Sequence, residues 1–253
     1  ITADHLAFYT GARLTRFGPE DKLYDYGFVS DYQNKLFHKD PVDANRDVWT
    51  MLEAFRNPPF YAMLYWPTCG WPHLYSAIAW VAISAGLTAL GTWWLSDRRW
   101  FWNLLWVFSF LPTFAAFDYG QNTPLSFAIF AAVYVLLKKE MPLAAGLVAG
   151  LLLFKPQLLL GLGVWALLDI RRKWPCALGV VITGCALATI SYTALPIATE
   201  GFKESFNRNL KFDSFEQHKM HNPLAFARLL LPAQKIREYL THGKENNIEQ
   251  KVR

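Results

Sequence analysis

Polar side chains able to bind or activate a ligand gather where long apolar stretches of the sequence stop. One short segment carries Asp118, Gln121 and Asn122, and another places Lys155 directly before a proline. The carboxylate and amide groups of the first segment can hydrogen-bond a sugar or a lipid phosphate. The same groups can instead cap the helix expected to begin near Pro124, so their types alone leave both interpretations open.

Two cations stand beside apolar or proline-rich sequence. Lys155 separates two apolar runs, where a positive charge is costly and by default marks a functional site. Its ammonium group is a compact charge suited to a phosphate, although the long side chain can also reach interfacial water without binding anything. Arg56 directly precedes Asn57-Pro58-Pro59. Its guanidinium group could bind a phosphate or lie among lipid headgroups, and the sequence favours neither.

Asp4 is the acidic residue nearest the start of the sequence. A carboxylate in a loop beside a membrane can act as the general base that activates a hydroxyl group. The alternative is a helix N-cap or a solvated loop acid. The sequence opens at Ile1 in what has the character of a loop, so we expect a first membrane helix to be missing before it.

The composition predicts an all-α, multi-pass membrane protein. Hydrophobic residues make up 53% of the 253 residues and charged residues 18%, below the roughly 25% charged residues usual in soluble domains. Several windows of about 17–25 residues, the length that crosses ~30 Å of hydrocarbon, are almost free of charge. The net charge of +5 does not indicate a nucleic-acid partner, because most basic residues flank apolar runs, as membrane topology favours.

Six apolar runs are expected to cross the membrane. They cover about residues 73–95, 100–117, 123–137, 142–154, 157–168 and 175–198. The fourth and fifth runs are too short for a full crossing, since ~13 residues at 1.5 Å per residue reach only about 20 Å. Their junction at Lys155 should lie below the membrane surface, where non-helical backbone must be buried or line a wet cavity. We therefore expect short broken helices that line a cavity open to the outer side.

Four regions follow from these runs. Residues 1–71 form an outer region with interfacial helices, 72–198 the transmembrane core, 199–222 an outer polar loop, and 223–253 a partial helix and polar tail. Aromatic residues crowd the end of the first region: Tyr61, Tyr65, Trp66, Trp71 and Tyr75. This enrichment is typical of an aromatic belt at the membrane interface.

Basic clusters predict the orientation in the membrane. The clusters at 98–99, 138–139 and 171–173 alternate with the polar segments, and the positive-inside rule assigns them to the cytoplasm. The polar segments, the N-terminal region and the loop 199–222 then share the outer side. That loop carries a basic cluster of its own: Arg208, Lys211, His218, Lys219 and His221. Positive charge there suits an anionic ligand, although a solvated loop explains it equally well.

No metal or cofactor site is predicted. The three cysteines lack metal-ligand spacing, and the sequence has no glycine-rich phosphate loop or nucleotide-binding fingerprint. Four glycines in apolar runs are better interpreted as positions where membrane helices pack closely: Gly146, Gly150, Gly161 and Gly163. A site for a soluble nucleotide-sugar is therefore not indicated.

Six short motifs follow one another along most of the chain. They are Asp4-His5-Leu6-Ala7-Phe8-Tyr9, Leu23-Tyr24-Asp25, Asn57-Pro58-Pro59-Phe60 with a later Pro67, Tyr119-Gly120-Gln121-Asn122, Ala145-Gly146-Leu147 leading to Phe154-Lys155-Pro156, and Arg171-Arg172-Lys173-Trp174. Their order resembles glycosyltransferase family 87, a group of integral-membrane enzymes of the GT-C superfamily. The resemblance implies a GT-C-like helical fold and a sugar donor carried on a lipid phosphate.

The resemblance also implies roles for individual residues. Enzymes of the superfamily place a catalytic aspartate in the first outer loop, the position that Asp4 matches. His5 stands where a second acidic or polar residue is common. Gln121, Asn122 and Lys155 match polar positions that line the outer cavity of the family.

The implied reaction moves a hexose, such as mannose, from a polyprenyl-phosphate donor to an envelope glycolipid or glycan acceptor at a bacterial plasma membrane. Asp4 would take the proton of the acceptor hydroxyl, and Lys155 or Arg56 would stabilise the leaving phosphate. A single displacement of this kind inverts the anomeric centre and requires no metal. His221 and Asn222 match an Asn-containing motif that opens a late helix of the family, which adds them to the predicted substrate-binding residues.

Two other functions remain compatible with the residues alone. Short broken helices around a cation also suit a transporter or flippase of a lipid-linked or anionic solute, although no internal repeat is present. A non-catalytic scaffold for envelope assembly is the second alternative. In a scaffold, replacing Asp4 or Lys155 should change stability alone.

Overall fold

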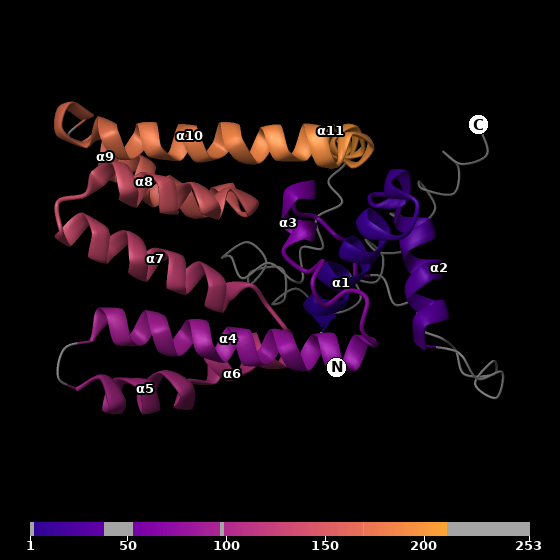
Figure 1. Cartoon of the computed structure of the whole chain (residues 1–253), viewed down its shortest axis with the longest axis horizontal. Coiled ribbons are helices and arrows are strands. Elements are labelled where there is room, and N and C mark those ends of the chain that lie inside the picture. Colours follow the sequence, from indigo (N-terminus) through magenta and orange to yellow (C-terminus); the bar gives the residue numbers. More distant parts are fainter. Residues whose placement is uncertain (1–2, 38–52, 97–98, 169, 212–253) are drawn as a thin grey trace, which may run out of the picture. The chain divides into compact units, whose positions relative to one another are not determined.

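The computed structural model describes residues 3–37, 53–96, 99–168 and 170–211. Internal contacts divide the chain into a unit of residues 1–205 and a second unit that begins at Phe206; the description below concerns the first unit. Every regular element in the described ranges is a helix (Figure 1). The predicted all-α fold class is therefore confirmed.

The N-terminal region consists of short helices. They are α1 (Ala3–Arg16), the 3-10 turn η1 (Glu20–Lys22), α2 (Tyr26–Phe37) and α3 (Pro59–Met63). Asp25 begins α2, because its Oδ1 accepts the backbone N–H of Phe28 at 3.1 Å, and this bond lowers the pKa of Asp25. The buried Gln33 of α2 exchanges two hydrogen bonds with the backbone of Glu53, at 2.9 and 3.0 Å. These bonds fix the chain where it returns towards α3.

The apolar part of the chain contains the longer helices. They are α4 (His73–Leu95), α5 (Trp100–Ser109), α6 (Leu111–Asp118), α7 (Thr123–Lys138), α8 (Pro142–Gly150), η3 (Leu151–Phe154), η4 (Pro156–Leu159), α9 (Leu160–Leu167) and α10 (Ile170–Ala194). In the described residues, α4 and the part of α10 from Lys173 are long and apolar enough to cross a membrane. The pair α5–α6, bent by 66°, adds a third candidate if it counts as one span. The six expected crossings remain a prediction, because the other apolar helices are shorter.

The last described helix, α11 (Pro196–Lys211), extends into the region expected to be a polar loop. Residues 199–211 are helical rather than looped. Pro196 suits the first helical position, where no N–H donor is needed, and Oε1 of Glu20 accepts the backbone N–H of Ala198 at 2.8 Å. The carboxylate that stabilises the start of α11 thus comes from η1, far away in the sequence.

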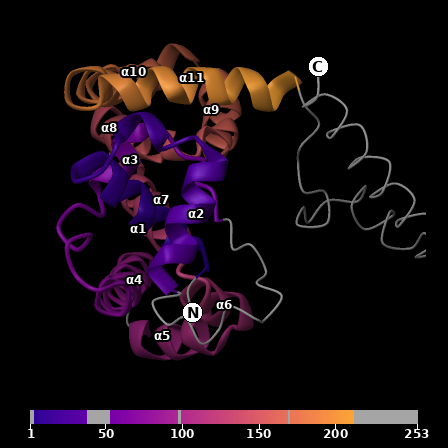
Figure 2. The same cartoon turned by 90° about the vertical axis from the view of Figure 1, so that its right-hand side faces the viewer.

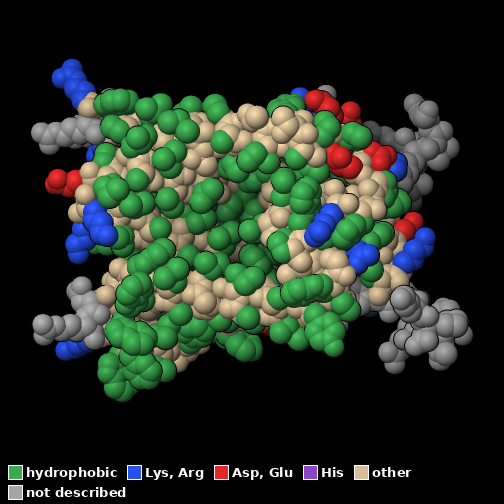
Figure 3. Space-filling model, in the orientation of Figure 1, with side chains coloured by type: hydrophobic (Ala, Val, Ile, Leu, Met, Phe, Trp, Pro, Cys, Tyr) green, Lys and Arg blue, Asp and Glu red, His purple; other side chains and the backbone are tan. Residues whose placement is uncertain are grey.

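The ends of the apolar helices and the short N-terminal helices lie at opposite ends of this unit. The adjoining ends of α4 and α5, of α7 and α8, and of α9 and α10 lie together at one end of the helices, whereas α1, α2 and α3 lie at the other end (Figures 1 and 2). The adjoining helix ends carry the described basic residues Arg99, Lys138 and Lys139. Hydrophobic side chains cover most of the face drawn in Figure 3, and Lys and Arg side chains lie towards the two ends.

Helices α8 and α10 approach so closely that glycine is needed where they meet. A Cβ atom added at Gly146 would lie 2.0 Å from the carbonyl oxygen of Cys176, and one added at Gly150 would lie 2.5 Å from Cβ of Thr183. The hydroxyl of Thr183 donates to the carbonyl of Leu147 at 2.8 Å across the same contact. The predicted close packing is therefore confirmed for Gly146 and Gly150.

Gly161 and Gly163 of α9 do not show this close packing within the described part of the chain. A Cβ atom added at either position would meet no neighbouring atom of the described residues within 4 Å. Glycine permits a close approach between helices, but the approach also needs a neighbouring helix at that face, which the sequence of α9 alone does not specify.

Substituting Gly146 by alanine should destabilise the protein, because the new methyl group would meet a backbone carbonyl that has no side-chain freedom to move aside. Overpacking of this kind typically costs about 1–3 kcal/mol. Gly161→Ala is the matched control, since alanine in open space should be neutral or should stabilise the helix by up to about 1 kcal/mol. Thermal unfolding in detergent compares the two variants, and equal midpoints would contradict the close contact.

His5 ties α1 to α4 inside the protein. Its side chain is fully buried, with Nδ1 3.4 Å from Nε2 of His73 and Nε2 3.3 Å from Oγ of Ser76. Burial, together with the neighbouring His73, lowers the pKa of His5 to about 3. The imidazole is therefore neutral at neutral pH, with one nitrogen that donates and one that accepts.

The free energy of unfolding should fall as the medium becomes acidic. An unfolded histidine takes up a proton below its usual pKa of about 6.5, whereas folded His5 stays neutral down to about pH 3. The proton taken up on unfolding should lower the stability by about 2 kcal/mol between pH 7 and pH 5. His5→Asn removes this titration, so unfolding measured at both pH values should show a smaller loss in the variant. An unchanged pH dependence would contradict the neutral, buried imidazole.

Candidate active site

Two oppositely charged side chains from distant parts of the sequence attract one another. Asp4 lies in the first turn of α1, and Lys155 lies in the break between η3 and η4. Both side chains are half-buried. They lie close enough for the charge of Asp4 to act on Lys155, where it partly offsets the cost of burying that cation. The structure thus brings together the predicted general base and the predicted phosphate-binding cation.

Pro156 explains why Lys155 lies at a break in the helix. A residue before proline is pushed out of the α-helical region, and Lys155 has φ −135° and ψ 76°. Pro156 also has no N–H group with which to continue the helical ladder. The interruption expected at this point is present, and the backbone on both of its sides forms 3-10 turns.

The turn between α6 and α7 fixes the start of α1. The backbone N–H of Asp4 donates to the carbonyl of Tyr119 at 2.9 Å. Gly120 closes the turn with φ 63°, a conformation that glycine adopts without strain. The indole N–H of Trp80 donates to the carbonyl of Gly120 at 3.2 Å, which attaches the turn to α4. These contacts set the position from which the Asp4 side chain projects.

Tyr61 and Tyr65 extend the site around the charged pair. Their hydroxyl oxygens are 3.1 Å apart, and the charge of Asp4 acts on both. The ring of Tyr61 stacks on the ring of Phe154, with the two centroids 4.6 Å apart. Phe154 immediately precedes Lys155 in the chain, so this contact places Tyr61 beside the charged pair. Burial raises the pKa of both phenols, so at neutral pH they keep their protons and act as neutral hydrogen-bonding groups.

The prediction that these two tyrosines belong to an interfacial belt is wrong, because their exposed fractions are only 3% and 2%. Tyr61 and Tyr65 are four residues apart in and just after α3, and this spacing puts both on one face of a helical turn. Trp71 and Tyr75 are exposed, as a belt requires. Trp71 and Tyr75 have the same four-residue spacing, so the spacing alone does not distinguish the buried pair from the exposed one.

Asn122 has a buried amide group without a partner. Its side chain is 1% exposed and occupies the N-cap position of α7, yet it makes no capping hydrogen bond. Neither Nδ2 nor Oδ1 forms a hydrogen bond of normal geometry, although the amide lies near the hydroxyl of Tyr61. Buried amides are rarely left unsatisfied. The capping interpretation is therefore wrong for Asn122, and its amide is available to a ligand.

The remaining predicted residues have other surroundings. Arg56 and Asp118 are exposed. Gln121 is half-buried, and its Oε1 accepts a hydrogen bond from the hydroxyl of Thr123 at 3.2 Å. Their roles in binding remain predictions.

His221 and Asn222 lie outside the described residues. Among the residues that the structure describes, no three His, Cys, Asp or Glu side chains are grouped so that they could hold a metal ion.

The candidate site is a cluster of five side chains: Asp4, Lys155, Tyr61, Tyr65 and Asn122. This cluster supplies a carboxylate, an ammonium, two neutral phenols and an amide. Such a set can accept a proton, neutralise an anion and hydrogen-bond hydroxyl groups, and its partial burial strengthens each of these interactions.

The model of glycosyltransferase family 87 matches residues 55–240. The matched range contains Asn122, Lys155 and both buried tyrosines, and Asp4 precedes it. A search of curated proteins and a search of solved structures each find no match. Since the family model covers well over half of the chain and α4 and α10 are apolar enough to span a membrane, this chain belongs to glycosyltransferase family 87, a family of membrane glycosyltransferases.

Proposed function

We propose that this membrane glycosyltransferase moves a hexose, such as mannose, from a polyprenyl-phosphate donor to a glycolipid or glycan acceptor of the bacterial envelope. The observation that carries the proposal is the attraction between Asp4 and Lys155. The unpartnered amide of Asn122 supports it from the same cluster. A sugar on a lipid phosphate needs a cation at the phosphate and hydrogen-bonding groups at its hydroxyls, and these residues offer both.

In the proposed reaction, a hydroxyl oxygen of the acceptor attacks the anomeric carbon of the donor sugar. A bond forms between that oxygen and the carbon, while the bond from the carbon to the phosphate oxygen breaks and its electron pair stays on the phosphate. Asp4 takes the proton of the hydroxyl as a general base. Lys155 stabilises the charge that develops on the leaving phosphate. One displacement of this kind inverts the anomeric configuration.

The neutral groups of the cluster hold the sugar in this scheme. Tyr61 and Tyr65 keep their protons because burial raises the pKa of both phenols. They therefore do not compete with Asp4 for the role of base, and they can hydrogen-bond hydroxyls of the sugar. Asn122 offers one acceptor and one donor group, which suits two neighbouring hydroxyls of a hexose.

The proposed site opens to the outer side of the bacterial plasma membrane. Arg99, Lys138 and Lys139 belong to turns at the end of the helices opposite α1 (Figure 1). The positive-inside rule assigns that end to the cytoplasm, which leaves Asp4 and Lys155 at the outer end. A donor anchored in the bilayer by its lipid would present its phosphate at this level.

Replacing Asp4 by asparagine should abolish most of the sugar transfer, because the amide keeps the shape of the side chain but cannot take a proton. Loss of a general base typically lowers the rate by roughly 10²–10⁴-fold. The assay supplies radiolabelled polyprenyl-phosphate mannose to membranes that contain the protein and follows label in the glycolipid fraction. Asp21→Asn is the matched control, since Asp21 is an exposed acid of η1 whose contact is to the neighbouring Lys22.

Equal transfer by the wild type and Asp4→Asn would remove Asp4 from the reaction. Absence of transfer by the wild type, with the protein folded, would contradict mannose on a polyprenyl phosphate as the donor. A screen of other lipid-linked sugars would then separate a different donor from the transporter alternative, for which no label should enter any acceptor.

Replacing Asn122 by leucine should separate activity from stability. The buried amide lacks hydrogen bonds and makes no capping bond to α7, so its loss should leave the thermal midpoint unchanged or raise it by the equivalent of about 1–3 kcal/mol. Sugar transfer should fall at least tenfold, because the leucine cannot hydrogen-bond the sugar. Transfer at the wild-type rate would exclude Asn122 from the binding site.

A further inference from the structure

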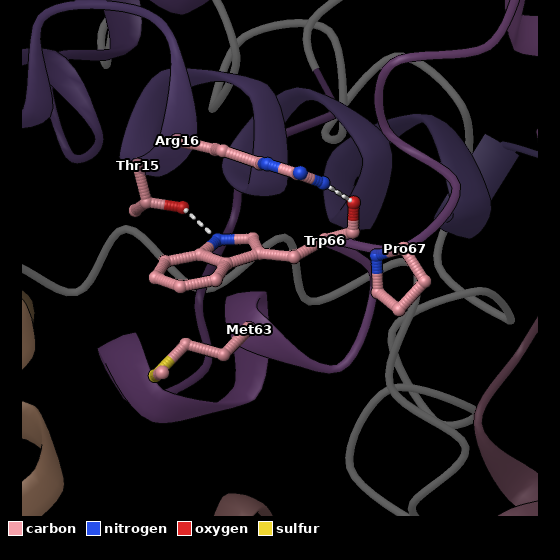
Figure 4. Close-up of a pocket in the computed structure, with 5 residues that line it drawn as sticks. All are labelled: Thr15, Arg16, Met63, Trp66 and Pro67. Atoms are coloured by element: carbon pink, nitrogen blue, oxygen red, sulfur yellow. Dashed lines mark hydrogen bonds between the residues drawn. The ribbon is translucent and has the colours of Figure 1, made fainter.

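A cavity lies between the last turn of α1 and the chain that follows α3. It has a volume of about 620 Å³ and is lined by Thr15, Arg16, Met63, Trp66 and Pro67 (Figure 4). It is wide open, so it suits a ligand that is only partly enclosed. From Asp4 to Arg16 the helix rises by about 18 Å, so the cavity is separate from the proposed transfer site.

The lining of this cavity combines one cation with apolar surface. The indole N–H of Trp66 donates to the hydroxyl of Thr15 at 3.0 Å, which fixes the ring. Met63 and Pro67 add apolar surface beside it. The exposed guanidinium of Arg16 donates to the carbonyl of Trp66 and has further N–H groups for a ligand.

No acid neutralises the cation of this cavity in the described part of the chain. None of the lining residues is acidic, and the ion pairs of the described residues involve Lys22 and Lys203, not Arg16. The cavity therefore suits an amphipathic ligand that carries a negative charge.

The position of the cavity indicates where such a ligand would come from. Only the segment 68–72 separates its lining from α4, which begins at His73 and is apolar enough to cross a membrane. The start of a membrane span lies at the level of the lipid headgroups. Phe17, Leu64 and Trp71, which are close to the lining residues in the sequence, are exposed by 47–60%, as expected of side chains that contact lipid rather than water.

We propose that this cavity binds the phosphate-bearing headgroup of a membrane lipid. Arg16 binds the phosphate through charge-assisted hydrogen bonds. Trp66 and Met63 contact the first methylene groups of the acyl chains, which continue along the exposed apolar side chains. The lipid is not a reactant, and the site does not depend on the sugar transferred by the enzyme.

The test measures lipid bound to the purified full chain in a nonionic detergent by native mass spectrometry. The probe is phosphatidylglycerol, and monoglucosyl diacylglycerol with the same acyl chains serves as the lipid without phosphate. We expect the wild type to bind phosphatidylglycerol at least tenfold more tightly than the control lipid. Arg16→Gln should remove this preference. Arg99→Gln, the same change at an exposed arginine near the other end of the helices, should keep it.

Two further variants distinguish loss of lipid binding from loss of the fold. They are needed because Arg16 also donates a hydrogen bond to the carbonyl of Trp66. Arg16→Lys retains the charge and should retain most of the binding. Met63→Trp should fill the cavity and abolish binding while Arg16 remains in place. Thermal unfolding without lipid identifies any variant that fails to fold.

The proposal is overturned if both Arg16→Gln and Met63→Trp bind phosphatidylglycerol as the wild type does. It is also overturned if the lipid without phosphate binds equally well. Competition with inorganic phosphate tests whether the cavity binds a lipid headgroup or a free phosphate ion. Phosphate that binds as tightly as the lipid would assign the cavity to the free ion, whereas much weaker competition supports the lipid.

Discussion

The attraction between Asp4 and Lys155 is the interaction on which the candidate active site depends. Both charges are partly removed from water, and a buried charge is costly unless an opposite charge or hydrogen bonds compensate it. The pair therefore favours the arrangement in which the start of α1 stays beside the break at Pro156. The close contact of α8 with α10 at Gly146 supports the same arrangement, because α8 leads through η3 directly to Lys155.

Polar contacts between distant residues hold α1 in place. The N–H of Asp4 bonds to Tyr119, and the neutral His5 bonds into α4. Position along α1 then separates two kinds of chemistry, with the proposed transfer site at its start and the proposed lipid site at its end. Helix α3 also contributes to both sites from opposite faces. Tyr61 of the proposed transfer site and Met63 of the proposed lipid site are two residues apart, which corresponds to about 200° around a helix. One small framework thus carries both proposed sites.

Local rules accounted for much of the fold and for the cation of the site. Charge-free windows predicted the apolar helices, and α4 covers the residues expected of the first run. The restriction that proline places on the preceding residue predicted the break at Lys155. The residue types singled out Lys155, because an isolated cation between apolar runs is unusual without a role. These inferences need information from only a few neighbouring residues, whereas the role predicted for Asp4 came from the resemblance to the family.

The sequence by itself thus determined the helical membrane class, the site of the break and the candidate base and cation. The tertiary structure decided which side chains surround them. Tyr61 and Tyr65 are buried beside the pair instead of facing the interface, Asn122 lacks a partner instead of capping α7, and Gly161 faces open space. Burial and hydrogen-bond partners depend on segments that meet only in the folded chain, so local periodicity and propensity carry no information about them.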